Sequence, residues 1–496
     1  MKKVCILLAV LLLLCGCGQN NDSMPDKNSG VQTTAPGLTD NELVSFDVFA
    51  VNDLHGKLLD TAAQPGVDEL STYLRQAKQA GNTIVLSTGD MWQGTSESNL
   101  TGGFIITEWL NAMDCTAMTI GGHEFDWGEE QIRKNGDLAE FPFLGINVYS
   151  RETNEQVDYC KSSVMVECQG AQIGIIGAIG DCYGSIAAEN TKGVYFITGD
   201  QLTALVKAEA ESLRNAGADF IIYAIHDGHD QTSDSVKPIA VEQLSYYDTA
   251  LSDGYVDLVF EADSHYNYVL QDLHGVYHLQ AGGNNNGISH ASVLLDLEHG
   301  DAFVYNAELI PNSKYSILEK DPTVEQLLEK YAEQIAPATK VLGINKNYQN
   351  GDNICQLVAD LYCHKGMEKW GQAYDIVLGG GYISCRSPGY LLAGEVTYSQ
   401  LQSLLPFDNE ISLCSIRGRD LVDKFLETDH YAYYIKTTDY GERIRGSVDP
   451  DAVYYVVTDS YSADYAYNNM TVIETYDANI YARDLLADYV AEGGLG

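Results

Sequence analysis

The sequence is short of basic residues. Only 29 Lys and Arg stand against 70 Asp and Glu, which gives a formal net charge of -41 at pH 7. A chain of this charge repels polyanions at long range, so a nucleic-acid polymer is not expected as a partner. A small phosphorylated substrate stays compatible with the charge, because a bound divalent metal can dominate the local field on an acidic surface.

Cysteine pairs of the CxxC type are absent. The chain has 11 Cys. Three lie within the first seventeen residues, and the other eight are Cys115, Cys160, Cys168, Cys182, Cys355, Cys363, Cys385 and Cys414. A zinc site built from thiolates is therefore not expected. Disulfides are permitted outside the cell but not required, because a chain of this size can bury enough core without them.

Long apolar runs are also absent, apart from one at the N-terminus. Lys2 and Lys3 precede an apolar run too short to span a bilayer comfortably, which is typical of an export signal in residues 1–17. The end of this signal resembles the lipobox of bacterial lipoproteins, and Cys17 fits the lipidated position. Residues 18–43 are polar and predict a flexible tether. The expected location is the outer face of the bacterial cytoplasmic membrane, or the periplasm or cell surface; a soluble secreted protein cleaved nearby is the alternative.

What is present from Val44 onward is an alternation of short apolar runs with helical stretches. A chain of 496 residues, with hydrophobic residues at 45% and charged residues at 20%, is expected to form two globular domains. The strand-helix alternation predicts an α/β layered domain over residues 44–318, with ligand groups at the carboxyl ends of its strands. Residues 319–340 predict a connecting helix that opens at Asp321-Pro322 and ends near Pro337. Residues 341–496 then predict a second α/β or α+β domain.

Acidic and imidazole side chains gather at five of the expected strand ends. They are Asp53 and His55 in "NDLHG", Asp90 in "TGDMWQG", His123 in "GGHEFDWG", His226 in "AIHDGHD", and Asp263 with His265 in "EADSH". A single histidine at a strand end is more often structural. Five such segments in order favour a metal site, because each carboxylate or imidazole would otherwise be buried without a partner. Their mixture of carboxylate and imidazole suits Mn²⁺, Fe, Zn²⁺ or Mg²⁺.

These motifs, in this order, resemble the calcineurin-like metallophosphoesterases. The resemblance is to the two-domain bacterial group of 5′-nucleotidases, UDP-sugar hydrolases and 2′,3′-cyclic nucleotide phosphodiesterases, and "LLAGEVTYSQLQSLLPFDNEISLCSIRGRDL" resembles that group's second domain. The resemblance implies a four-layer α/β sandwich carrying two divalent metals, joined by a helix to a smaller α/β (α+β) substrate-binding domain.

The resemblance also implies a set of metal ligands. Asp90 matches the bridging carboxylate, Asp53, His55 and His265 match the first metal, and His226 and Asp263 match the second. Two positions depart from the group: Gly122 stands where an Asn ligand is usual, and Asp263 where a His is usual. The departures predict a weaker second site that prefers Mn²⁺, Mg²⁺ or Ca²⁺ over Zn²⁺.

His123 and Asp126 match the group's His-Asp dyad, which stabilises the transition state or protonates the leaving oxygen while metal-bound hydroxide attacks phosphorus. The alternative is that His123 only caps a loop. Glu124 and Trp127 are interpreted as packing or hydrogen-bonding residues. For the substrate, Phe407 and Tyr461 match the two aromatics that stack on the base. The group's arginine after the glycine run is missing, and Arg386 lies close by.

The sequence therefore predicts an extracytoplasmic hydrolase of nucleotide phosphate esters, of the 5′-nucleotidase or cyclic phosphodiesterase type. One alternative is a phosphodiesterase or pyrophosphatase acting on nucleotide sugars or a non-nucleotide ester. A second is a metal- or nucleotide-binding lipoprotein without turnover. The physiological substrate and the oligomeric state stay open.

Overall fold

The structure is a computed structural model. It describes residues 43–60, 65–79, 81–183, 186, 188–230, 236–238, 251, 254–386, 388–426, 433–463, 469–477 and 479–496. The expected signal, Cys17 and nearly all of the tether lie outside these residues. In the described part of the chain no helix is long and apolar enough to cross a membrane, and no two cysteines form a disulfide.

The first lobe contains a six-stranded sheet in the order β15-β14-β1-β2-β3-β4. Strands β1 to β4 run parallel to one another, and the hairpin of β14 and β15 is added antiparallel to β1. Their bounds are Leu43–Val51 (β1), Thr83–Ser87 (β2), Ala117–Thr119 (β3), Phe143–Leu144 (β4), Gly287–Asp296 (β14) and Asp301–Pro311 (β15).

A second, seven-stranded sheet follows the order β10-β12-β13-β11-β9-β7-β6. Its central strands β7, β9, β11 and β13 are parallel. The bounds are Ser163–Cys168 (β6), Ala171–Ile179 (β7), Phe220–His226 (β9), Lys237–Pro238 (β10), Leu258–Phe260 (β11), Asn267–Gln271 (β12) and Tyr277–Ala281 (β13). A small ribbon pairs β5 (Val148–Ser150) with β8 (Val194–Phe196).

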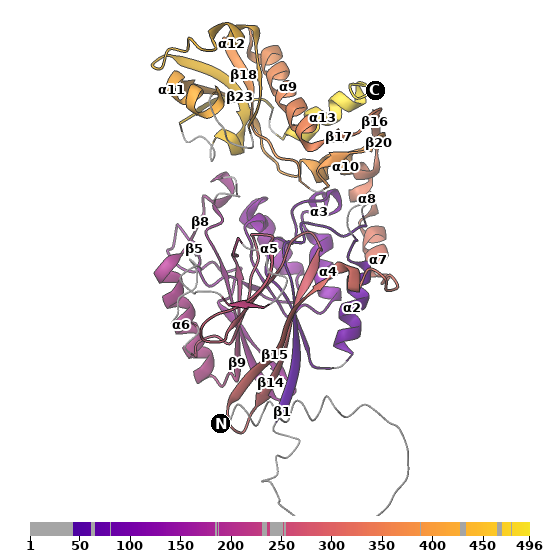
Figure 1. The fold of residues 1–496 in the computed structure, drawn as a ribbon, viewed down its shortest axis with the longest axis vertical. Helices are drawn as coiled ribbons and strands as arrows, with labels where there is room; N and C mark the ends of the chain where they lie inside the picture. The colour runs from indigo at the N-terminus through magenta and orange to yellow at the C-terminus, as the bar shows by residue number, and fades with distance from the viewer. Residues whose placement is uncertain are drawn as a thin grey trace, which may run out of the picture. The chain divides into compact units, whose positions relative to one another are not determined.

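The two sheets pack face to face. One buried cluster joins them, and within it the rings of Phe46 on β1 and Phe220 on β9 meet edge-on at 5.7 Å. Helix α6 (Gly199–Asn215) covers the outer face of the second sheet. Helices α2 (Asp68–Lys78), α4 (Phe104–Ala112) and α5 (Gly128–Leu138) cover that of the first, with α3 (Ser96–Leu100) nearby (Figure 1). The four layers confirm the predicted α/β sandwich, in which apolar strands supply both the inner and outer cores.

The connector differs from the single helix predicted. Helix α7 (Thr323–Lys330) begins after Pro322 and ends at Tyr331, where φ is -98° and ψ is 10°; α8 (Ala332–Ile335) and a 3₁₀ turn (Ala336–Thr339) follow. The connector is therefore helical over most of its length but interrupted at one residue. The Tyr331 side chain is buried at the break, and its hydroxyl donates a hydrogen bond of 2.8 Å to Glu108 on α4. Packing against α4 therefore coincides with the interruption.

The second lobe is built on a mixed five-stranded sheet in the order β22-β18-β23-β21-β24. Helix α9 packs on one face with α10 and α13, and α11 and α12 lie against the other. The helices are Gly351–Trp370 (α9), Tyr398–Leu404 (α10), Gly418–Leu421 (α11), Asp439–Ile444 (α12) and Ala482–Ala491 (α13). The strands are Val341–Asn345 (β16), Gln349–Asn350 (β17), Ile376–Tyr382 (β18), Tyr390–Leu391 (β19), Gly394–Thr397 (β20), Ile411–Arg417 (β21), Tyr433–Thr437 (β22), Val453–Asp459 (β23) and Thr471–Thr475 (β24). The lobe has the α+β architecture expected.

Candidate metal and substrate site

The strand-end residues singled out from the sequence come together in space. Asp53 and His55 follow β1, Asp90 follows β2, His226 is the last residue of β9, and Asp263 with His265 follows β11. Because β1 and β2 are parallel, and β9 and β11 are parallel, the carboxyl ends of both sheets meet along one edge. Three groups of these side chains bring their ligand atoms within 4.8 Å of one another: Asp53/His55/His265, Asp53/Asp90/His226 and Cys182/His226/Asp263.

The backbone at these positions is strained. Five of the eleven non-glycine residues with positive φ in the described chain are predicted ligands, with values of 48° to 65°: Asp53, His55, Asp90, Asp263 and His265. Left-handed backbone is unfavourable for residues with a Cβ and persists where surrounding contacts fix it, most often at functional sites. Two such contacts are the hydrogen bonds from the Asp53 amide to Gly89 and from the His55 amide to Asp90, both 3.0 Å.

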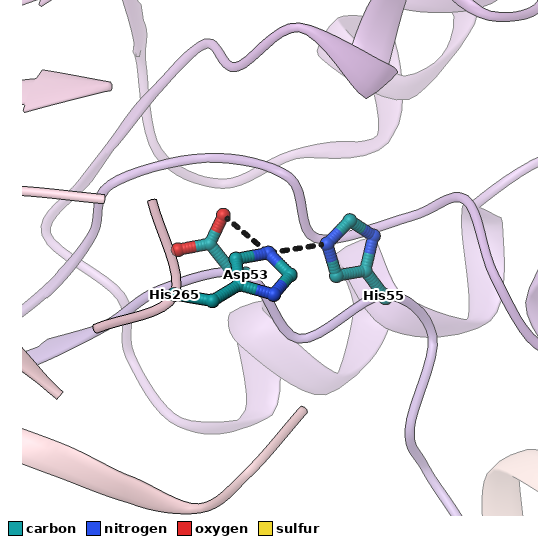
Figure 2. A group of neighbouring side chains, drawn as sticks. All are labelled: Asp53, His55 and His265. Atoms are coloured by element: carbon teal, nitrogen blue, oxygen red, sulfur yellow. Dashed lines mark hydrogen bonds and ion pairs between the residues drawn. The ribbon is translucent and has the colours of Figure 1, made fainter. Parts of the chain in front are cut away.

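The first group places two imidazoles and a carboxylate around one point (Figure 2). His265 Nε2 lies 3.4 Å from Asp53 Oδ1 and 3.1 Å from His55 Nε2. Burial and the neighbouring His265 lower the pKa of His55 to about 3, whereas Asp53 outweighs burial and raises the pKa of His265. A cation between the two ring nitrogens and the carboxylate would be in reach of all three ligand atoms.

The second group is centred on His226, which is fully buried. Its Nδ1 donates to the Thr88 carbonyl oxygen at 2.7 Å, and its Nε2 lies 3.3 Å from Asp90 Oδ1 and 3.8 Å from Asp263 Oδ1. Burial alone would lower the pKa of His226, but Asp90 outweighs it and raises the pKa well above its usual value. A buried positive charge is thus favoured here, which is the electrostatic requirement of a divalent metal site.

The "GGHE" segment packs around the Asp90 carboxylate. A Cβ on Gly121 would lie 2.4 Å from Asp90 Oδ1, so only glycine fits there. Gly122, in right-handed backbone, offers no side chain to the cluster. The Glu124 carboxylate accepts hydrogen bonds of 2.8 Å from the amides of Asp90, Met91 and Gly121. Glu124 is therefore a hydrogen-bonding residue, as interpreted from the sequence.

The predicted dyad is formed. His123 Nδ1 lies 2.9 Å from Asp126 Oδ2, and the His123 ring stacks on Phe407 with a centroid distance of 5.2 Å. Burial alone would lower the pKa of His123, but Asp126 and Asp90 outweigh it and raise the pKa to about 9. The imidazole therefore favours its protonated form, which can donate a hydrogen bond or a proton to a substrate oxygen.

A cavity of about 660 Å³ is lined by residues of both lobes, and Asp263 is the predicted metal ligand among them. His123, Asp126 and Asp263 line one side, and the three predicted substrate residues Phe407, Tyr461 and Arg386 all line the other. The guanidinium carbon of Arg386 lies 4.9 Å from the centre of the Phe407 ring. Arg386 therefore reaches the cavity from outside the glycine run, where the group's arginine is replaced by Ile383.

Tyr461 lies beside a second tyrosine of the cavity wall. The ring centroids of Tyr461 and Tyr382 are 5.8 Å apart. Both side chains line the cavity. The pair of aromatics predicted for stacking is thus present in one cavity, while Phe407 already stacks on His123 and lies under Arg386.

Three residues at the site were not found from the sequence. Gln93 donates to the Pro406 carbonyl oxygen at 2.8 Å, and buried Arg483 donates to the Phe407 carbonyl oxygen at 2.9 Å, so both position the segment that carries Phe407. Cys182 belongs to the group with His226 and Asp263. Its signal in the sequence is its place just after the apolar run of β7, which corresponds to the places of Asp53 after β1 and Asp263 after β11.

Comparison with known proteins agrees with this arrangement. Residues 334–472 match the model of the 5′-nucleotidase C-terminal domain family. The chain is 26% identical over 415 residues to endonuclease YhcR of Bacillus subtilis, covering 77% of this chain but only 32% of that protein. It is 25% identical over 423 residues to protein UshA of Yersinia enterocolitica, covering 76% of this chain and 73% of UshA.

A solved structure shares the fold. The 5′-nucleotidase precursor from Thermus thermophilus superposes with a TM-score of 0.67 at 18% identity, over 90% of this chain and 96% of that one. The chain thus shares its fold with a 5′-nucleotidase precursor, and the Asp/His groups lie at the carboxyl ends of the strands of that fold. In sequence the chain is similar to protein UshA, and residues 334–472 match the 5′-nucleotidase C-terminal domain that the motifs predicted.

Proposed function

We propose that the protein hydrolyses phosphate esters of nucleotides in a metal-dependent reaction. The observation that carries the proposal is the shared cavity: Asp263 of the Asp/His cluster, the His123-Asp126 pair, Arg386 and two aromatics line one space of about 660 Å³. A cavity of this size suits a small organic ligand. In this assignment residues 44–318 catalyse the hydrolysis and residues 341–496 bind the substrate. Residues 319–340 connect the two domains.

The residues present fit two divalent metal ions. Asp53, His55 and His265 would hold one ion, His226 and Asp263 would hold the other, and Asp90 lies between the two groups. Metals so placed polarise a phosphoryl oxygen and make a bound water a better nucleophile at neutral pH. The fully buried Nε2 of His226 supports the assignment, since it faces the carboxylates of Asp90 and Asp263 at 3.3 and 3.8 Å, a set of donors that suits a cation.

His123 is the proposed general acid. Asp126 engages its Nδ1 at 2.9 Å and fixes the ring, which leaves Nε2 for the leaving oxygen or for charge on the phosphoryl group. Arg386 supplies positive charge to the phosphate side, in a protein whose acidic surface would otherwise repel it. Phe407 and Tyr461 offer aromatic surface to a nucleobase.

The experiment measures metal content by elemental analysis together with phosphate release from 5′-AMP, 2′,3′-cyclic AMP, UDP-glucose and an aryl phosphate, with Mn²⁺ added. His123→Ala is expected to lower turnover by about 10²- to 10⁴-fold, the usual contribution of a general acid. His274→Ala, a change at an exposed histidine, is the control. Release only from the cyclic or nucleotide-sugar ester would favour the phosphodiesterase alternative, and no release from any ester at saturating metal would exclude the enzyme.

We further propose that the protein is exported and lipid-anchored through Cys17, since the N-terminal sequence resembles a lipoprotein signal. Expression in a bacterial host fed radiolabelled palmitate tests this. Label is expected in the wild type and in Cys15→Ala but not in Cys17→Ala. Label retained by Cys17→Ala, or absent from the wild type, would contradict the anchor.

A further inference from the structure

Cys182 lies in the group that also contains His226 and Asp263, although no motif assigns it a role. It follows β7, whose last residue Ile179 is in register with His226 on the adjacent parallel strand β9. The side chain is 5% exposed, its Sγ lies 3.8 Å from the His226 carbonyl oxygen, and it lines the same cavity as Asp263. The β7 loop thus delivers a thiol to the carboxyl edge of the sheet, beside the ligands from β9 and β11.

The spacing of the donors suits one ion. Ligand atoms of Cys182, His226 and Asp263 lie within 4.8 Å of one another, and Asp90 Oδ1 lies 3.3 Å from His226 Nε2. Tetrahedral zinc with bonds of about 2.0 to 2.3 Å places its ligands roughly 3 to 4 Å apart, so small side-chain movements would close these donors around a metal.

The His226 imidazole is oriented by a hydrogen bond at one nitrogen, and its other nitrogen faces the carboxylates of the group. Its Nδ1 donates to the Thr88 carbonyl oxygen at 2.7 Å, the outer contact that commonly orients a metal-ligating histidine. Its Nε2 has no exposed surface and makes no hydrogen bond. This second observation points to a ligand independently of the cysteine, because a fully buried ring nitrogen that faces the Asp90 and Asp263 carboxylates at 3.3 and 3.8 Å suits a cation held between them.

We propose that Cys182 is a ligand of the second metal and takes the place of the amide ligand missing at Gly122. The site would then consist of the Cys182 thiolate, His226 Nε2, Asp263 and the shared Asp90. On binding, the S–H bond breaks, its proton passes to solvent, and a metal–sulfur bond forms. The inference rests on the proposed function only in placing a metal at this group.

The proposal changes the expected metal preference. The ligands visible in the motifs, with Asp263 in place of histidine, predicted a preference for hard ions such as Mn²⁺ or Mg²⁺. A thiolate is a soft ligand and shifts preference to Zn²⁺ or Co²⁺. It also adds one negative charge, so three carboxylates and one thiolate offset the four positive charges of two divalent ions. Attraction of the phosphate would then depend more heavily on Arg386 and His123.

The test is spectroscopic and needs no substrate. Full-length protein stripped with EDTA is titrated with Co²⁺, and the near-ultraviolet band from thiolate-to-cobalt charge transfer is recorded. The band is expected in the wild type and in the control Cys160→Ser, a buried cysteine at 6% exposure that belongs to none of the three metal groups. In Cys182→Ser the band should vanish, and zinc affinity at one of two sites should fall about 10- to 100-fold.

A second measurement guards against misfolding of the variant. Native wild-type protein is treated with iodoacetamide with and without Zn²⁺, and alkylation is mapped by peptide. Zn²⁺ should protect Cys182 and leave the labelling of Cys160 unchanged. Phosphate release without a cobalt-thiolate band or zinc protection would overturn the inference and leave the enzyme assignment standing. A band with no hydrolysis would support the ligand and count against the enzyme.

Discussion

The side-chain amide of Gln93 donates a hydrogen bond of 2.8 Å to the carbonyl oxygen of Pro406, a residue 313 positions away in the sequence. The backbone carbonyl of Gln93 also lies 3.1 Å from Nδ1 of His55. One residue of the β2 loop therefore contacts both a proposed metal ligand and the segment that presents Phe407. This contact links the metal edge of the first lobe to the substrate face of the second.

Replacing Gln93 with Met should weaken substrate binding more than chemistry. The change keeps the side chain's size and the backbone contact with His55, and it removes only the bond to Pro406. Loss of one hydrogen bond costs about 1 kcal/mol, which predicts a rise of roughly fivefold in KM with kcat nearly constant. Steady-state kinetics with 5′-AMP measure the split, with exposed Gln326→Met as control. A fall in kcat with unchanged KM would show that Gln93 acts on the chemical step rather than on substrate binding.

The sequence predicts that the metal-binding residues meet at one edge of the fold. It does not predict the further residues that the structure adds to the site. Asp53, Asp90, His226 and Asp263 each follow an apolar run, and parallel strands bring their carboxyl ends to one edge. Cys182 likewise follows the apolar strand β7. A buried cysteine is usually a packing residue, so the sequence alone does not predict Cys182 as a ligand. The contacts of Gln93 and Arg483 with residues 406–408 depend on how distant segments pack. No local pattern encodes them.

Glu124 should be needed for folding and for metal affinity. Its carboxylate accepts three backbone hydrogen bonds around Asp90 and is fully buried. Glu124→Gln replaces one acceptor oxygen by an NH₂ group that faces a backbone N–H, so at least one buried donor loses its partner. We expect a loss of about 1 to 3 kcal/mol in unfolding free energy, measured with urea in EDTA.

Glu130→Gln is the matched control for that change, because Glu130 is exposed and pairs only with Lys134 one helical turn away. It should change stability by less than about 0.5 kcal/mol. Equal stability of the two variants would show that the carboxylate does not hold the Asp90 turn.

Replacing Phe407 should weaken the binding of nucleotide esters but not of esters that lack a base. Phe407→Leu keeps an apolar side chain but removes the aromatic face, and stacking of a base on such a face contributes about 1 to 3 kcal/mol. We expect KM for 5′-AMP to rise about tenfold while kcat/KM for glycerol phosphate changes little. If both substrates lose activity together, the main role of Phe407 is its stack on His123, which lies at a centroid distance of 5.2 Å.

His278 should make stability depend on pH outside the metal site. It is fully buried, and its Nδ1 lies 2.7 Å from Glu261 Oε1. Burial alone would lower its pKa, but Glu261 and Asp272 outweigh it and raise the pKa from 6.5 to about 9. Because the folded pKa exceeds the unfolded one, this stabilisation is complete below pH 6.5 and is lost as pH rises through about 9.

The difference in unfolding free energy between wild type and His278→Asn, in EDTA, isolates that contribution. The gap should be widest near pH 6 and narrow toward pH 9, with a slope of at most about 1.4 kcal/mol per pH unit. The control is His299→Asn, which alters a side chain with 41% of its surface exposed. A gap that stays constant across the range would show that His278 is neutral in the folded protein.

Restoring the usual ligands at Gly122 and Asp263 should raise zinc affinity and make Cys182 dispensable. Gly122 has φ -64° and ψ -49°, which an Asn adopts readily, and the φ of 65° at Asp263 resembles that of His55 and His265. Gly122→Asn with Asp263→His replaces one negative charge by an imidazole and adds an amide oxygen. Zinc affinity of the second site and zinc-supported turnover should rise about tenfold, the order seen for single changes around metal sites.

In that background Cys182→Ser should cost less zinc affinity than in the wild type, because four other donors remain. Zinc titrations of the four proteins measure the coupling, and an unchanged zinc affinity in the double variant would refute this account of the second site.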